Sequence, residues 1–431
     1  MTAATLFDAA HLQRRRDLLG PVVDRLAAIY SAEEVDALRI DAIDAGFLAQ
    51  RSGRGFVDRD ILETLLGNLL EAVAPGSHNA GSAEHRRGDL AGAVGTIADQ
   101  LYATIAQSLL AAGLERGVEE RAMSTACALL WDLPRIKERA RWNRFASLRD
   151  PAVWDAYLVG RCGLDPAQLA GAGFGAQIDL AIARRDMGEY AAFLGQLGCE
   201  KSGCGRILDY QMQLVMSAYP GWRVLLYHDV AHSLTLSSEV GDGCQSNRAP
   251  VPFLPRAIAE LGARYYQADL HPETRVGDAN FLDHTHRGIT TGQTGVIGSG
   301  CHLLPCTLGG LSEKVQQRHP IIGDGVSIGT DAGLFGSVGV GDRSVIGPNT
   351  EIHGLVEIGP DCRIGASVFV GTIRSGDRPP GRVVLGQGVR VGAGTIIENE
   401  SELDLVIPGK ADIPARSHVN NNGFGSPRYV G

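Results

Sequence analysis

Aliphatic residues recur at every sixth position through much of the second half of the chain. Nine consecutive positions of this kind are occupied by Ile322, Ile328, Leu334, Val340, Ile346, Ile352, Ile358, Ile364 and Val370. A period of six fits neither an amphipathic helix nor an alternating strand. It fits a triangular coil in which each side of six residues directs one aliphatic side chain inward, with about 18 residues in a full turn. The region therefore predicts a β-solenoid.

The same spacing continues on both sides of this stretch, at Val276, Leu282, Leu385, Val391 and Ile397. The segment 372–382, TIRSGDRPPGR, interrupts it and is too polar and proline-rich to lie inside a coil, so we expect a loop ejected from the solenoid. Glycine follows many of the aliphatic positions, which accounts for much of the total of 56 glycines. Tight corners favour glycine because a Cβ would strain their backbone.

Upstream of residue 269 the apolar residues recur three and four positions apart, which is typical of helices. The segments 22–40 and 90–114 show this clearly, and 207–236 indicates two helices joined at Pro220–Gly221. We expect an α+β chain with an all-α N-terminal half followed by a parallel β-helix. The boundaries we predict are a helical extension over 1–155, a second helical domain over 156–268, and a solenoid with a C-terminal tail over 269–431.

Charge and composition exclude several classes of protein. The formal net charge is −9 and the isoelectric point is near 5.8, so no basic field would attract nucleic acid or an anionic membrane. No segment has 18 consecutive apolar residues, and the first 20 residues do not resemble a secretory signal, so we expect a cytoplasmic protein. The eight cysteines lack paired CxxC spacing, which favours free thiols over a metal site.

The segment 269–288, DLHPETRVGDANFLDHTHRG, places three histidines and several carboxylates in the first coil. A metal nest, a solvated loop and a proton-transfer site are the alternatives. Asp269 and His284 are 15 residues apart, close to one turn of the solenoid, so we expect their side chains to approach on neighbouring levels. An imidazole beside a carboxylate is suited to general base chemistry.

The chain resembles the serine O-acetyltransferases, acetyl-CoA-dependent enzymes of the left-handed hexapeptide-repeat superfamily that form O-acetyl-L-serine. The motifs YPGWRVLLYHDVAHSL, DLHP, LDH, TLGG and RHP carry the resemblance, which covers about residues 210–350. A hexapeptide repeat alone is weakly specific, but these motifs in this order are strongly specific. The resemblance implies a left-handed parallel β-helix in which a hydroxyl acceptor attacks the thioester directly.

The resemblance also implies roles for individual residues. His284 takes the position of the catalytic base, and Asp269 would accept the other ring N–H and stabilise the imidazolium. Asp283 would face the amino group of an amino-acid acceptor, while Arg318 would pair with its carboxylate. His319 would line the same pocket.

Three further positions match those along which the family lays the pantetheine arm of acetyl-CoA, namely Gly310, Thr330 and Pro348. Because the family binds this co-substrate between chains, the resemblance implies a homotrimer, or a hexamer formed through the helices. It implies no metal ion.

The sequence departs from the family at several places. The stretch THRG after His284 is one residue longer, and Asp229 stands where the family usually has arginine. The family's acceptor-binding aspartate has no clear match: Asp209 comes slightly late, and Asp150 in RDPAV (149–153) would need an inserted subdomain after it. The chain ends NNNGFGSPRYVG rather than in an isoleucine tail, so a tail-mediated cysteine synthase complex is not predicted.

Three alternatives stay open at this point. The first is an acyltransferase of the same mechanism acting on homoserine or a specialised metabolite. The second is a metal-dependent lyase of the carbonic anhydrase type on the same solenoid, with His284, His302 and His319 around zinc. The third is a catalytically inactive scaffold, which would not bind CoA.

Overall fold

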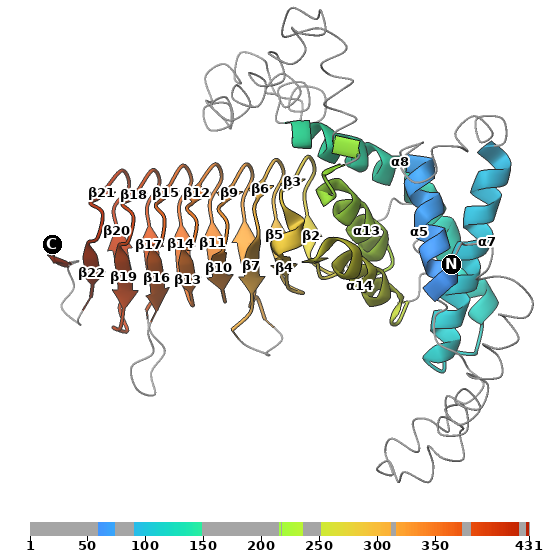
Figure 1. The fold of residues 1–431 in the computed structure, drawn as a ribbon. Coiled ribbons are helices and arrows are strands. Elements are labelled where there is room, and N and C mark those ends of the chain that lie inside the picture. Colours follow the sequence, from blue (N-terminus) through green and yellow to red (C-terminus); the bar gives the residue numbers. More distant parts are fainter. Residues whose placement is uncertain are drawn as a thin grey trace, which may run out of the picture. The chain divides into compact units, whose positions relative to one another are not determined.

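A computed structural model describes residues 59–73, 90–148, 215–216, 218–235, 251–311, 316–372, 381–421 and 428–430. All of them belong to one compact unit, Asp58–Gly431. The helices are α5 (Arg59–Val73), α7 (Leu90–Ala111), α8 (Val118–Leu148), α13 (Gly221–Ser233) and α14 (Leu254–Tyr266), and a parallel solenoid follows them (Figure 1). Among the residues described, no helix combines the length and apolar character needed to span a membrane.

The helices confirm the sequence pattern where the two can be compared. The period over 90–114 corresponds to α7, and α13 begins at Gly221, directly after the predicted break. The predicted helix over 22–40 lies outside the described residues. A Cβ on Gly221 would meet the side chain of Leu282 at 2.9 Å, so glycine at this position lets α13 lie directly against the solenoid.

Each coil of the solenoid contributes one strand to each of three sheets. Sheet A contains β1 (Ala268–Asp269), β4 (Ile289–Thr291), β7 (Cys306–Gly309), β10 (Ala332–Phe335), β13 (Glu351–His353), β16 (Phe369–Thr372), β19 (Ile396–Asn399) and β22 (His418–Asn420), and ends with the antiparallel β23 (Arg428–Val430). Sheet B contains β2 (Arg275–Val276), β5 (Val296–Ile297), β8 (Ile321–Ile322), β11 (Val338–Val340), β14 (Val356–Ile358), β17 (Val383–Leu385) and β20 (Leu405–Ile407). Sheet C contains β3 (Phe281–Leu282), β6 (His302–Leu303), β9 (Ser327–Ile328), β12 (Val345–Ile346), β15 (Arg363–Ile364), β18 (Arg390–Val391) and β21 (Asp412–Ile413).

The six-residue period forms the solenoid core, as predicted. All nine positions from Ile322 to Val370 are buried and belong to one continuous hydrophobic cluster. Neighbouring sheet A strands are 18 residues apart where Gly333 pairs with Glu351 and Glu351 with Phe369. The helical region followed by a left-handed parallel β-helix is the fold class expected from the sequence. Most of the predicted ejected loop, residues 373–380, lies outside the described residues.

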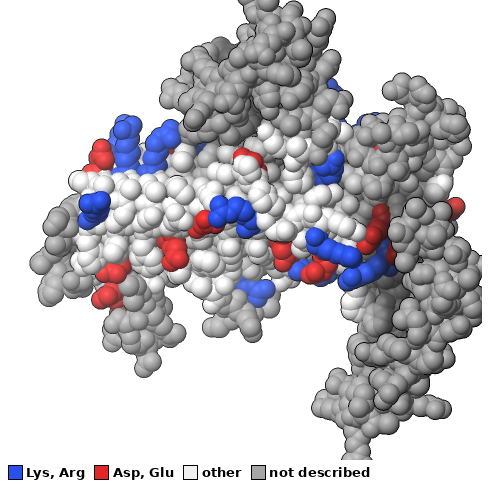
Figure 2. Space-filling model, viewed as in Figure 1, with Lys and Arg blue, Asp and Glu red and all other residues white. Residues whose placement is uncertain are grey.

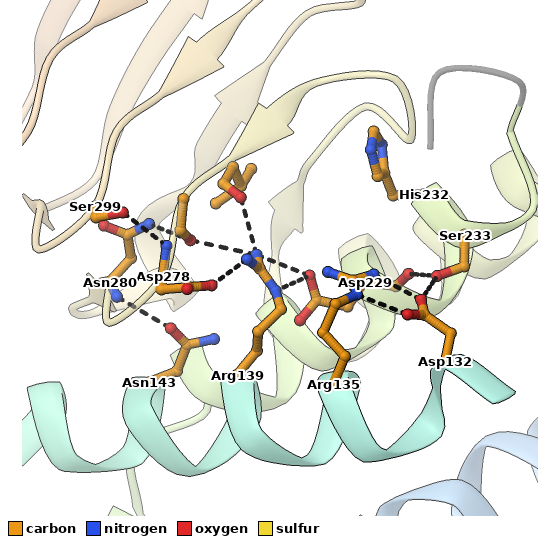
Figure 3. A network of polar contacts seen from close by, with 12 residues as sticks. Asp132, Arg135, Arg139, Asn143, Asp229, His232, Ser233, Asp278, Asn280 and Ser299 are labelled. Atoms are coloured by element: carbon orange, nitrogen blue, oxygen red, sulfur yellow. Dashed lines mark hydrogen bonds and ion pairs between the residues drawn. The ribbon is translucent and has the colours of Figure 1, made fainter. Parts of the chain in front are cut away.

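A buried polar network joins α8 and α13 to the first coil (Figure 3). Arg139 of α8 donates to Asp229 of α13 at 3.0 Å, to Asp278 of the coil, and to the carbonyl oxygen of Val276 at 2.9 Å. Burial raises the pKa of the Asp229 carboxyl, and the Arg139 guanidinium opposes that shift. The network fixes α8 against the turn that precedes β3.

From Asp278 a ladder of hydrogen bonds continues along one corner of the solenoid. The Asp278 backbone N–H donates to Ser299 Oγ at 3.0 Å, and the Ser299 N–H donates to Asp324 Oδ1 at 2.7 Å. The Asp324 N–H in turn donates to Asp342 Oδ1 at 2.9 Å. These bonds satisfy corner N–H groups that the sheets leave unpaired.

Candidate active site

The first candidate corner follows β3 and comprises residues 283–288. We call it the His284 corner. His284 has a left-handed backbone conformation with φ 50°, and a short 3₁₀ helix, Thr285–Arg287, follows it. The additional residue in THRG is accommodated in this turn. Arg287 donates to Asp331 at 3.0 Å and so ties the corner to the start of β10.

Asp283 lies between two histidines. Its Oδ1 is 3.6 Å from His284 Nε2, and its Oδ2 is 3.4 Å from His302 Nε2. The His284 side chain is 61% exposed, whereas those of Asp283 and His302 are 15% and 12% exposed. The corner therefore presents one accessible imidazole beside a carboxylate that is largely buried.

Aromatic stacking fixes His302. Its ring lies parallel to that of Phe281, with centroids 5.0 Å apart and an interplanar angle of 6°. The two residues are register partners in β3 and β6, and Tyr219 contacts the Phe281 ring at 6.0 Å. His286 adds an edge contact to His284 at 5.7 Å.

Asp269 lies in a different environment from the one its spacing suggests. Its register partner is Thr290 in β4, and both of its carboxylate oxygens accept hydrogen bonds from Arg256 of α14, at 2.8 and 3.0 Å. The pairing raises the pKa of Arg256. In the described part of the chain, the carboxylate that contacts His284 is that of Asp283.

The second candidate corner comprises residues 292–295, 310–311 and 316–320. We call it the His319 corner. The His319 ring lies between two glycines: a Cβ on Gly292 would overlap the ring, and one on Gly310 would meet its Nε2 at 2.9 Å. His319 Nδ1 is 2.9 Å from Thr294 Oγ1. Burial lowers the pKa of His319, and neighbouring Arg318 lowers it further. The imidazole is therefore held neutral and in a fixed orientation.

Arg318, which is half-buried, is the arginine of this corner. Its Nη2 donates to Gln293 at 3.2 Å, and its backbone N–H donates to Thr294 Oγ1 at 3.1 Å. The backbone is thus fixed, and a guanidinium can pair with a carboxylate through two parallel hydrogen bonds. Gly310, which the sequence assigned to acetyl-CoA, contacts Arg318 and His319 directly.

The two corners lie at opposite ends of the sheet A strands. The His284 corner precedes β4, and Gly292 of the His319 corner follows it. At about 3.3 Å per residue, a strand separates its two ends by on the order of 10 Å. A single chain therefore brings Asp283, His284 and His302 together, and Arg318, His319 and Gly310 together, but as two separate groups.

Thr330 and Pro348 belong to the same edge of the solenoid as His284. Thr330 precedes β10 and Pro348 precedes β13, as the His284 corner precedes β4. The Asn349 N–H donates to the Thr330 carbonyl oxygen at 2.9 Å, which stacks these two corners directly. Two of the three positions predicted to contact the pantetheine arm, Thr330 and Pro348, thus form a column that continues from His284, whereas Gly310 lies at the other end of the sheet A strands.

The remaining predictions concern metals, thiols and charge. The described residues contain no group of three or more His, Cys, Asp or Glu side chains able to hold a metal ion. Cys301, Cys306 and Cys362 are buried free thiols, and burial raises the pKa of Cys301 to about 12. Figure 2 shows basic and acidic side chains interspersed over the visible face of the solenoid.

Sequence reasoning missed Arg256 and Arg139, and it named His302 only as a zinc ligand of the carbonic anhydrase alternative. Arg256, His302 and Arg139 each act across 13 to 139 sequence positions, which local spacing does not reveal. The unusual Asp229 was the only signal for Arg139. Asp150 and Asp209, the two candidates for an additional acceptor-binding carboxylate, lie outside the described residues, although α8 ends at Leu148, just before the RDPAV segment.

The fold and the two corners define a left-handed β-helix protein with an exposed histidine beside a carboxylate. The serine acetyltransferase of Synechococcus elongatus is 31% identical over 178 residues, covering 41% of this chain and 62% of that protein. The serine acetyltransferase of Helicobacter pylori is 30% identical over 139 residues, covering 32% of this chain and 74% of that protein. The chain belongs to the serine acetyltransferase family.

The match is partial in two respects. The chain spans less than two thirds of the length of the Synechococcus relative, and no protein-family model matches it. The crystal structure of Entamoeba histolytica serine acetyltransferase 1 in complex with L-cysteine aligns with a TM-score of 0.40 and 18% identity, covering 71% of this chain and 85% of that one.

Proposed function

We propose that the protein is an acetyl-CoA-dependent O-acetyltransferase whose acceptor is L-serine. Membership of the serine acetyltransferase family supports the reaction class. The observation that carries the proposal is the His284 corner, where an exposed imidazole adjoins a carboxylate at the position of the family's base. A serine hydroxyl is a weak nucleophile at neutral pH and requires such a base.

His284 is the general base in this mechanism. Its imidazole accepts the hydroxyl proton as the serine oxygen bonds to the thioester carbonyl carbon. The tetrahedral intermediate then collapses, the C–S bond breaks, and the proton passes to the departing thiolate. The products are the O-acetyl ester and free CoA, and no acyl-enzyme forms. Asp269, the partner that the resemblance implies for His284, is held by Arg256.

The acceptor carboxylate binds at Arg318. A guanidinium on a fixed backbone suits bidentate pairing with a carboxylate. Neutral His319, wedged between Gly292 and Gly310, forms the adjacent wall. The acceptor is thus selected first by its carboxylate.

The active form is a trimer with its sites between chains. The His284 corner and the His319 corner occupy opposite ends of the sheet A strands, so one acceptor contacts both only if two chains contribute. Acetyl-CoA lies along the column of Thr330 and Pro348, with its thioester toward His284. A hexamer formed through the helices is the larger assembly consistent with the sequence.

Thiol release from acetyl-CoA tests this function. Purified protein is assayed with L-serine, with homoserine and with a panel of other hydroxy acceptors, and His284→Ala is the matched variant. Serine-dependent release that disappears in the variant supports the proposal. Release only with another acceptor points to the same mechanism on a different substrate. No release with any acceptor, together with no binding of CoA, indicates a scaffold.

A further inference from the structure

Thr274 and Thr291 form a buried hydroxyl pair next to the His319 corner. Their Oγ1 atoms are 2.9 Å apart, and the two residues are only 0% and 5% exposed. Thr274 lies in the turn between β1 and β2, and Thr291 is the last residue of β4, directly before Gly292. The pair therefore connects the turn of the first coil to the loop 292–295.

The hydrogen bonds of this pair run in one direction. The His271 backbone N–H donates to Thr291 Oγ1 at 3.1 Å, and Thr274 Oγ1 donates to the Gly292 carbonyl oxygen at 2.9 Å. A hydroxyl has a single proton, and that of Thr274 is used on the carbonyl oxygen, so Thr291 donates to Thr274. A chain of three hydrogen bonds thus leads from the His271 backbone to Gly292.

The turn at the start of this chain is anchored by a helix. His232 Nδ1, from α13, donates to the Pro272 carbonyl oxygen at 2.7 Å. The Thr274 backbone N–H closes the turn by donating to the His271 carbonyl oxygen at 2.9 Å. The hydroxyl pair therefore starts from a fixed backbone, which a positioning residue requires.

The loop 292–295 in turn determines how the His319 ring is held. Gly292 lies against the ring so closely that a Cβ there would overlap it. Thr294 Oγ1 accepts hydrogen bonds from the backbone N–H groups of Arg318 and His319, at 3.1 and 3.2 Å, so its own proton goes to His319 Nδ1 at 2.9 Å. The neutral ring then carries its proton on Nε2. Ring position and tautomer both depend on this loop.

We infer that Thr274 and Thr291 are positioning residues that hold His319 through Gly292 and so shape the acceptor pocket. The inference rests on the proposed function. Valine at position 274 would set a methyl group against the Gly292 carbonyl oxygen. Because carbon–oxygen contacts are about 0.5 Å longer than this hydrogen bond, Gly292 would shift by a similar amount. The His319 ring would shift with it.

Kinetics of thiol release test the inference with the acceptor and acetyl-CoA varied in turn. Thr274→Val should raise KM for L-serine about tenfold. It should change KM for acetyl-CoA less than about twofold, because Thr330 and Pro348 lie at the other edge of sheet A. Thr274→Ser keeps the hydroxyl and should stay within about twofold of the wild type in both. An unchanged KM for serine in Thr274→Val would overturn the inference while leaving the proposed function intact.

Thr291→Val interrupts the same chain one step earlier. It removes the acceptor of the His271 N–H and the donor to Thr274, and should also raise KM for serine. The double variant should be no worse than the more affected single variant, because both residues act through one chain of hydrogen bonds. Effects on KM that multiply in the double variant would contradict this shared action and overturn the inference.

Thr395→Val is the matched control. Thr395 is also a fully buried threonine of the solenoid, and its Oγ1 donates to the Pro414 carbonyl oxygen at 3.0 Å, but it lies directly before β19, several coils beyond β7. It should lower the denaturant midpoint about as much as Thr274→Val, with both KM values unchanged. Equal increases in KM for serine in the two variants would reduce the effect to general destabilisation and overturn the inference. A wild type that releases no thiol with any acceptor would overturn both the inference and the proposed function.

Discussion

Arg139 and Asp229 form a buried ion pair between α8 and α13, with Nε and Oδ1 3.0 Å apart and side chains only 10% and 5% exposed. The resemblance to the family leads one to expect arginine at position 229. The aspartate found there is matched by an arginine from α8, 90 residues earlier in the chain. The same guanidinium contacts Asp278 and so connects the helices to the turn before β3. An interface between two helices thereby also supports the segment that leads to His284.

Arg139→Met should strongly destabilise the protein. The change leaves Asp229 buried without its cation, and removing one partner of a buried pair typically costs about 3–5 kcal/mol. Arg343→Met is the control, because Arg343 and Asp361 form an exposed pair at 2.7 Å for which about 1 kcal/mol or less is expected. Chemical denaturation followed by circular dichroism measures both. Equal losses in the two variants would contradict a special role for the buried pair.

His228→Phe should make the protein less sensitive to acid. His228 is buried in α13, neither ring nitrogen has a hydrogen-bond partner in the described region, and burial lowers its pKa to about 3. The unfolded chain takes up this proton near pH 6.5. The contribution of His228 to the free energy of unfolding is therefore fully present above that pH, and it falls by about 1.4 kcal/mol per pH unit as the pH decreases from 6.5 toward 3.

The measurement is the free energy of unfolding at several pH values between 7.5 and 4.5. The free energy of unfolding should fall more steeply with decreasing pH in the wild type than in His228→Phe. The difference in slope should correspond to the uptake of one proton on unfolding. The phenylalanine variant should be at least as stable at neutral pH, since it buries no unpaired ring nitrogen. Parallel curves for the two proteins would show that His228 does not carry the acid sensitivity.

The sequence predicts the solenoid well because the core pattern is local. Each six-residue side of a coil carries its own buried aliphatic residue, such as Ile322 or Leu334. It predicts contacts between coils less well. Asp269 was placed near His284 on the assumption of regular coils. The first coil is longer, with Ala268 pairing with Ile289 and Asp269 beside Thr290, so the role of Asp269 toward His284 stays a prediction. The contact between Asp269 and Arg256 depends on where α14 docks, which local spacing does not encode.

Gly292→Ala should reduce activity with little effect on folding. The new Cβ would overlap the His319 ring, and since a side chain yields more readily than backbone, the imidazole should be displaced. A small displacement in an active site lowers the rate by about tenfold or more. Gly339→Ala is the control, because a Cβ there meets nothing within 4 Å. Normal kcat/KM in Gly292→Ala would argue against His319 as part of the acceptor pocket.

Mixing two inactive variants should restore activity if the site forms between chains. His284→Ala lacks the base, and Arg318→Ala lacks the carboxylate-binding group, so each homotrimer should be inactive. Because the two residues lie at opposite ends of the sheet A strands, a mixed trimer contains interfaces where one chain supplies an intact His284 and its neighbour an intact Arg318. With random assembly from equal amounts, about a quarter of the interfaces have this composition.

Co-expression with two purification tags isolates the mixed species, and thiol release is then measured. Each purified mixed trimer has one such interface out of three, so activity near about a third of the wild-type value supports a shared site. Mixed trimers as inactive as the parents would place both residues in a single-chain site.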